Sequence, residues 1–303
     1  MFIVNPVPYT YEALCRNLEE LLQEYSFLKG FSIGTSVSGR NLHAISWGKG
    51  HRRLFVNGAH HGMEWMTSLL LMRLLEVISS HYRNRTSLGI YDLERLYSEV
   101  TVVFCPMVNP DGVNLSLGGL TEDMPPLMKT RLKSYNGDST DFSKWQANLH
   151  GVDLNHNYNA SFAKGVFLQH KLGIFSPGPT RFSGGEPESE PESKAVADFT
   201  REFLPDAVVA YHSQGEIIYY DFESKATEKG KKMAADLSDL SGYTLDQTEG
   251  MASCSGYKDW VIGEFYIPAF TIEVGLGENP LPLSQFDKIY KDNLPMLLYL
   301  MHA

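Results

Sequence analysis

Two adjacent histidines and a glutamate stand together in the segment NGAHHGMEWM, residues 57–66. Imidazole nitrogens and carboxylate oxygens are ligands that zinc commonly takes in proteins. Either His60 or His61 could act together with Glu64, because both spacings place two side chains on one face of a helical turn. Such a pair also arises often by chance. The segment alone therefore leaves open both a metal site and a polar turn with hydrogen-bonded histidines.

Three short apolar segments lead to residues of this kind. RRLFVNG precedes the histidine pair, residues 207–211 lead to His212, and residues 269–274 carry Glu273. Their length and β-rich composition predict strands. Ligands of open α/β sheets bind beyond the carboxyl ends of the strands, so we expect these side chains to converge there. Two histidines and a carboxylate would form a zinc site with room for one water, and a further carboxylate could act as general base.

Helical patterns separate these strands. Thr10 can cap a helix with apolar residues at positions 14, 18, 21, 22 and 25, and residues 64–80 predict a buried helix. Further helices are predicted over 226–240 and 284–301, and at the end of SGGEPESEPESKAVADFTREF. Alternating strands and helices predict one α/β domain, residues 1–303, with a mixed, largely parallel twisted sheet and helices on both faces.

One long region has no clear hydrophobic period. The segment EVTVVFCPMVNPDG predicts a buried strand that is closed by a turn at residues 109–112. The polar residues 113–150 that follow are expected to form a long loop.

Composition excludes several classes of protein. Of 303 residues 43% are hydrophobic and 20% charged, which allows a sizeable core, and the net charge of −10 argues against nucleic acid or anionic membrane as a partner. Cys15, Cys105 and Cys254 form no CxxC pair, which indicates reduced thiols. No signal peptide is evident, and the most apolar segment contains Arg73 and Glu76 and is too short to span a bilayer. We therefore expect a cytoplasmic protein without a membrane span.

Several motifs occur in one order along the chain: GAHHGMEW, GVDLNHNY, YHSQG, DW and FTIE. Together they resemble the zinc carboxypeptidase family, with its order HxxEW, GVDxNRN, HS, DW and FTxE. The resemblance covers essentially the whole chain, including GTSVSGR near the N-terminus. It implies a carboxypeptidase-like fold and a zinc-dependent metallopeptidase with one Zn²⁺ per chain.

The resemblance also assigns roles to single residues. His61, Glu64 and His212 match the three zinc ligands of the family, whereas His60 occupies a position that the family does not use as a ligand. Glu273 matches the general base that activates the zinc-bound water and then delivers a proton to the leaving amine.

Further positions bear on substrate binding. Asn155 matches an asparagine that holds the terminal carboxylate of the substrate, although a turn-capping amide is the alternative. The arginine that follows this asparagine in the family is His156 here, which cannot form a bidentate fork. The position of the family tyrosine that closes over the substrate is Met251 here, and the nearby Tyr257 is a candidate for that role that the motifs do not assign. Asp259, beside a tryptophan, is expected to be structural.

The residue that stabilises the oxyanion is not identified by the motifs. The family arginine usually follows a tryptophan before the GVDxN motif, where this chain has Gln146 after Trp145. Lys144 and Arg131 are the other candidates.

Lys258 indicates the class of substrate. Its position, just before the DW pair, lines the floor of the specificity pocket in carboxypeptidases. An unpaired ammonium group in a pocket is costly, so Lys258 should bind a distal carboxylate of the leaving residue. The alternative is a bond between Lys258 and a carboxylate of the protein itself. Glutamate, aspartate and meso-diaminopimelate would all supply the distal carboxylate.

The segments GVDLNH, HSQGEIIYY, GYKDW and TIEVGLGENPLP resemble the bacterial γ-D-glutamyl-diaminopimelate peptidases within this family. That resemblance implies cleavage of murein stem peptides in peptidoglycan fragments. A metallocarboxypeptidase for acidic C-terminal residues is the main alternative. A deacylase of the aspartoacylase type and a catalytically inactive binding protein rank lower, because the FTIE and GVDLN motifs and Glu273 are present.

Overall fold

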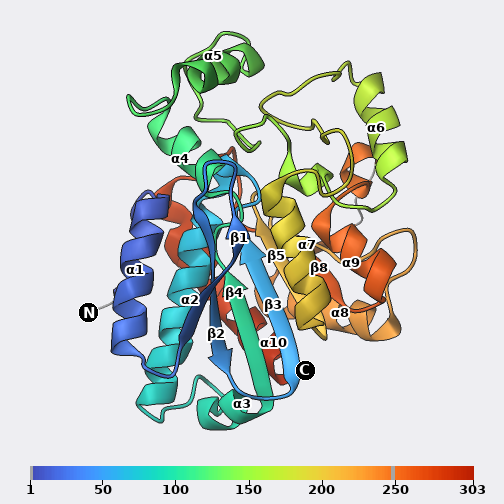
Figure 1. Ribbon diagram of the computed structural model, residues 1–303. Helices are drawn as coiled ribbons and strands as arrows, with labels where there is room; N and C mark the ends of the chain where they lie inside the picture. Colours follow the sequence, from blue (N-terminus) through green and yellow to red (C-terminus); the bar gives the residue numbers. More distant parts are fainter. Residues whose placement is uncertain (1–2, 247–249) are drawn as a thin grey trace.

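A computed structural model describes residues 3–246 and 250–303. One eight-stranded sheet runs through the protein in the order β1-β2-β4-β3-β5-β8-β6-β7 (Figure 1). The strands are β1 (Lys29–Thr35), β2 (Asn41–Gly48), β3 (Arg52–Gly58), β4 (Val100–Cys105), β5 (Ala207–His212), β6 (Ile217–Tyr219), β7 (Thr244–Asp246) and β8 (Ala269–Glu273). The four central strands are parallel, and antiparallel pairs join β2 to β4 and β6 to β8. The predicted mixed α/β fold is confirmed.

The central strands are buried on both faces, as is usual for parallel strands covered by helices. All six residues of β5 are buried, and most residues of β3 and β8 are buried too. In the register between β5 and β8, His212 lies directly beside Glu273. The strand order therefore brings two of the predicted site residues together at the carboxyl ends of neighbouring strands.

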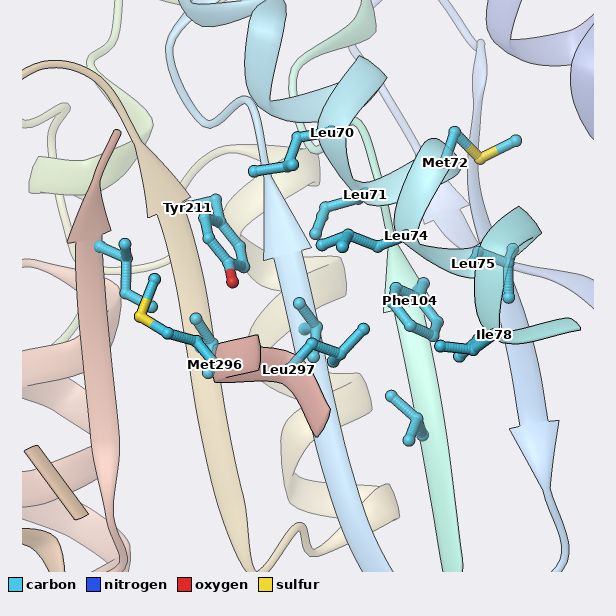
Figure 2. Close-up of a cluster of buried hydrophobic side chains, with 14 of the residues drawn as sticks. Leu70, Leu71, Met72, Leu74, Leu75, Ile78, Phe104, Tyr211, Met296 and Leu297 are labelled. Carbon is cyan, nitrogen blue, oxygen red and sulfur yellow. The ribbon is translucent and has the colours of Figure 1, made fainter. Parts of the chain in front are cut away.

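Helices cover both faces of the sheet. The helices that do so are α1 (Tyr11–Glu24), α2 (Met66–Arg83), α7 (Pro191–Phe203), α8 (Glu228–Ser241), α9 (Tyr257–Phe265) and α10 (Phe286–His302). One apolar core joins α1, α2, α8 and α10 to one face of the sheet, and a second joins α7 and α9 to the other. Figure 2 shows the first core, in which Leu71 and Leu74 of α2 and Leu297 of α10 lie close to Tyr211 and Phe104 of the sheet.

The predicted elements near the site are confirmed. The hydroxyl of Thr10 caps α1 by accepting a hydrogen bond from the backbone N–H of Ala13. The helix expected over residues 64–80 is α2, which begins at Met66 after a 3-10 turn, η1 (Gly62–Glu64). The predicted helices at 226–240 and 284–301 correspond to α8 and α10.

The expectation of a long loop over residues 113–150 is wrong in part. This region contains the end of α4 (Pro110–Gly118) and all of α5 (Pro126–Tyr135). The expected turn at 109–112 is instead the start of α4, because the side chain of Asn109 accepts a hydrogen bond from Gly112 N–H and Pro110 occupies the first turn. Together with α3 (Leu93–Glu99) and α6 (Phe162–Lys171), α4 and α5 complete the helices of the described residues.

Two further expectations concern a membrane span and the state of the cysteines. Among residues 3–246 and 250–303, no helix has the length and apolar character needed to cross a bilayer. Cys15, Cys105 and Cys254 are all free thiols.

Candidate active site

The turn that carries the histidine pair is held tightly on two sides. Backbone N–H groups of Gly62 and Met63 donate to the carbonyls of Gln146 and Trp145. The side chain of Asn109 donates to the carbonyl of His60. A Cβ atom on Gly62 would lie 2.4 Å from the backbone of α4, so only glycine fits at this contact. The end of β3, the start of α4 and the segment around Gln146 together fix where His61 projects.

His61, Glu64 and His212 form one cluster. Their ligand atoms all lie within 4.8 Å of one another. The Nδ1 atom of His61 lies 2.8 Å from one oxygen of Glu64, and the Nδ1 atom of His212 lies 3.0 Å from the other. Two imidazole nitrogens that face a single carboxylate are a donor set suited to zinc, and they leave one side of the cluster open to the groove described below.

Asp153 lies behind this cluster and orients it. One oxygen of the buried Asp153 carboxylate lies 3.0 Å from Nε2 of His61, the ring nitrogen opposite the one that faces Glu64. Metal-binding histidines commonly bond through their other nitrogen to a carboxylate in this way, which fixes the tautomer and the ring. This contact is a second observation that fits a metal centre. Asp153 stands inside the GVDLN motif, but no role was predicted for it, because a buried partner of His61 cannot be recognised from spacing alone.

His60 takes a different direction from His61. It is fully buried, and its Nε2 atom lies 2.9 Å from the hydroxyl of Tyr158. Its ring stacks on that of His212 with the centroids 5.5 Å apart. Burial lowers the pKa of His60 well below its ordinary value. The imidazole is therefore uncharged and packs against the side of the cluster.

The charges in the cluster lower the pKa of one carboxyl group and raise that of another. Burial would raise the pKa of Glu64, but His61 and His212 lower it to about 2. Burial would lower the pKa of His61, but Glu64 and Asp153 raise it well above its ordinary value. The pKa of Glu273 is raised well above its ordinary value by burial and by the nearby Glu64 carboxylate. Glu273 therefore has the raised basicity that a proton-transfer group needs.

Two adjoining cavities open from the cluster. A groove of about 560 Å³ and an inner pocket of about 180 Å³ share His61, His156, Tyr219 and Glu273 as lining residues. The groove is lined in addition by Lys144, Gln146, Thr180, Arg181 and Glu278, and the inner pocket by Asn155, Lys258 and Thr271. Two cavities that border the cluster thus offer space for a substrate.

The predicted substrate-binding residues line these cavities. Asn155 lines the inner pocket, and its side-chain oxygen accepts a hydrogen bond of 3.0 Å from the backbone N–H of Tyr257. His156 borders both cavities, with Nδ1 lying 3.3 Å from the carbonyl of Cys254. Their roles toward a substrate stay predictions.

Lys258 lines the inner pocket, but its charge is already paired. The buried ammonium group donates to the Asp259 carboxylate and, at 2.6 Å, to the carbonyl of Asp221. This is the arrangement that the sequence left as the alternative to substrate binding. Asp259 is buried and holds Lys258, in agreement with the structural role expected for it.

Tyr257 does not face the cavities and so does not take the place of the family tyrosine that closes over the substrate. The hydroxyl of Tyr257 is buried and lies 2.8 Å from that of Thr200, and Met251 packs in a short 3-10 turn, η3 (Gly250–Ser253). Tyr219 on β6 instead borders both cavities. The sequence missed Tyr219 because β6 is a three-residue strand without a strong pattern.

Two of the three candidates for oxyanion stabilisation line the groove, and the third does not. Gln146 and Lys144 line the groove, whereas Arg131 lies exposed on α5 and lines neither cavity. The side-chain oxygen of Gln146 accepts a hydrogen bond from Thr180, and Lys144 lies 3.5 Å from Glu278. Gln146 and Lys144 therefore both stay candidates for this role by position.

Comparisons with known proteins agree with this geometry. A family profile described as zinc carboxypeptidase matches residues 14–296. The chain is 36% identical to gamma-D-glutamyl-L-diamino acid endopeptidase 1 of Lysinibacillus sphaericus over 293 residues. The aligned region covers 96% of this chain and 71% of the relative.

Two solved structures share the fold. Thrombin activatable fibrinolysis inhibitor superposes with a TM-score of 0.72 at 18% identity and covers 97% of this chain and 73% of its own. Murein-tripeptide amidase from Escherichia coli O157 superposes with a TM-score of 0.53 at 18% identity, over 89% of this chain and 91% of its own.

Proposed function

This chain belongs to the zinc carboxypeptidase family, and on that premise we propose that it hydrolyses the γ-D-glutamyl–meso-diaminopimelate bond of murein stem peptides. The observation that carries the chemistry is the His61, Glu64 and His212 cluster with Glu273 beside it. The class of substrate is supported by the Lysinibacillus relative, whose name specifies a γ-D-glutamyl-L-diamino acid.

The cluster would hold one Zn²⁺ per chain through His61, Glu64 and His212. When bound, zinc supplies a Lewis acid that polarises a carbonyl and lowers the pKa of water. Asp153 keeps the ring of His61 in place by its bond to Nε2.

Glu273 performs the proton transfers in this proposal. It lies at the end of β8, beside His212 in the sheet register, and lines both cavities. As general base it takes a proton from the attacking water, whose oxygen adds to the γ-carbonyl carbon of the glutamyl residue. It then returns a proton to the leaving amine as the C–N bond breaks.

Asn155 and His156 would hold the leaving residue. Both border the inner pocket, next to Glu273. The amide N–H groups of Asn155 and the imidazole of His156 offer hydrogen bonds to the terminal carboxylate of diaminopimelate. His156 replaces the two-pronged contact of a guanidinium by a single one, so recognition of this carboxylate is weaker than an arginine would provide.

The alternative, a metallocarboxypeptidase for acidic C-terminal residues, depends on Lys258 facing the substrate. The internal ion pair of Lys258 with Asp259 weakens this reading, and it equally removes Lys258 as an argument for diaminopimelate, which would supply the same distal carboxylate. Binding of a distal carboxylate by Lys258 stays a prediction that no contact in the structure supports.

The test uses L-Ala-γ-D-Glu-meso-diaminopimelate and a matched α-linked tripeptide, with products identified by mass spectrometry. We expect release of diaminopimelate from the γ-linked peptide only. Removal of metal with a chelator should abolish the activity, and added zinc should restore it. His212→Ala should lack both bound zinc and activity. Full activity of the metal-free protein, or cleavage of only the α-linked peptide, would contradict the proposal.

A further inference from the structure

Arg181 is a cation of the groove that has no internal partner within the part of the chain that the structure describes. Its side chain is exposed and lines the groove that also borders His61 and Glu64. Among residues 3–246 and 250–303 its guanidinium forms no hydrogen bond or ion pair, whereas Lys144 lies by Glu278 and Lys258 by Asp259. Arg181 is therefore available to a negatively charged ligand in the groove.

The backbone of Arg181 is tied through Asp153 to the cluster of His61, Glu64 and His212. Its N–H donates 2.8 Å to Asp153, whose other oxygen bonds His61. The preceding Thr180 donates to the same carboxylate. Arg181 also adopts a left-handed conformation with φ of 63°, which is uncommon for a residue with a side chain. Such conformations concentrate at functional sites, where surrounding contacts hold them in place.

The position of Arg181 determines which part of a substrate it can meet. The inner pocket, lined by Asn155 and Lys258, does not include Arg181. Arg181 lines the groove instead, together with Gln146 and Thr180. If the leaving residue occupies the inner pocket, as the proposed function has it, then Arg181 faces the acyl side of the scissile bond.

We propose that Arg181 is a specificity-determining residue that binds the free α-carboxylate of the γ-linked D-glutamyl residue. This inference rests on the proposed function. A γ-linkage leaves the α-carboxylate of glutamate free on the acyl side, whereas an α-linked peptide has an amide bond there. A guanidinium binds a carboxylate through two parallel hydrogen bonds, so Arg181 distinguishes the two linkages by charge and by shape.

The experiment compares two substrates that differ in one group: L-Ala-γ-D-Glu-meso-diaminopimelate and the same peptide with the α-carboxylate converted to a carboxamide. We expect the wild type to prefer the carboxylate in kcat/KM by roughly tenfold to a hundredfold, since hydrogen bonds to charged groups are strong. Arg181→Gln should bring this ratio close to one, mainly by loss on the carboxylate substrate. Arg181→Lys, which keeps the charge without the fork, should give an intermediate ratio.

Arg16→Gln provides the matched control, because Arg16 is an exposed arginine on α1 outside both cavities. It should keep the wild-type ratio, and zinc content and circular dichroism should be equal in all variants. Equal hydrolysis of both substrates by the wild type, an unchanged ratio in Arg181→Gln, or an equal loss on both substrates would overturn the role of Arg181 alone. Failure of the wild type on both γ-linked peptides, with cleavage of α-linked ones, would overturn the proposed function as well.

Discussion

Asp153 links two functions of the site at the level of single residues. One of its oxygens bonds His61 and the other holds the backbone of Arg181. A single carboxylate therefore sets both the direction of the His61 ring, a proposed zinc ligand, and the position of the proposed substrate-binding arginine. Neither contact follows from sequence spacing, because Asp153 and Arg181 meet only through the folding of the segment between them.

Asp153→Asn is expected to weaken zinc binding without unfolding the protein. The amide is nearly isosteric but lacks the charge that raises the basicity of His61. Loss of such a partner typically lowers metal affinity on the order of ten- to a hundredfold. Competition with a fluorescent chelator measures the affinity, and Asp198→Asn on the exposed face of α7 is the control. An affinity equal to that of the wild type would show that Asp153 does not support the ligand.

Sequence reasoning identified the residues of the site that stand in motifs. His61, Glu64, His212 and Glu273 were found because family spacing marked each of them, and the structure brings them together. Arg181 carries no such signal, since it stands in a loop segment without a chemical pattern. The ion partner of Lys258 could not be selected from the sequence, because both a substrate and Asp259 would satisfy an ammonium group.

At the level of elements, the start of α7 contains a buried carboxyl group. The Glu192 side chain accepts hydrogen bonds of 2.9 Å from the backbone N–H of Val37 and 3.0 Å from the side chain of Asn148. Burial nevertheless raises its pKa to about 7. The folded protein therefore favours the protonated form of Glu192 more strongly than the unfolded chain does.

This shift predicts a dependence of stability on pH. A carboxyl whose pKa is raised on folding stabilises the protein fully below its unfolded pKa of about 4.3. That contribution is lost as the pH rises through the folded pKa of about 7. Relative to Glu192→Gln, the wild type should lose at most about 4 kcal/mol of unfolding free energy across this window. Urea unfolding of both proteins at several pH values measures the difference, and parallel pH profiles would contradict the assignment.

The elements differ in how well the sequence predicted them. The central strands and α2 were predicted because long apolar runs mark buried segments. The edge strand β1 is mostly exposed and gave no such run. Helices α4 and α5 were not predicted because their start signals, Asn109 with Pro110 and the proline pair at 125–126, read equally well as turns.

For the molecule as a whole, the layered fold explains why distant segments form one site. The apolar cores on the two faces of the sheet hold the central strands parallel, and β3, β5 and β8 all end at the same edge. Figure 1 shows α4, α5 and α6 at this edge, beyond the carboxyl end of β3. The segments around α4 to α6 supply Gln146, Asp153 and Arg181, and thereby complete the groove.

The most direct measurement is hydrolysis of L-Ala-γ-D-Glu-meso-diaminopimelate in water enriched in heavy oxygen, with wild type and Glu273→Gln compared at equal zinc content. The wild type should place one heavy oxygen in the γ-carboxylate of L-Ala-γ-D-Glu and none in diaminopimelate. The variant should form this product slower by on the order of a hundredfold or more, because it lacks the base. Label in the alanine carboxylate, or a variant as fast as the wild type, would contradict hydrolysis of the γ-D-glutamyl bond by Glu273.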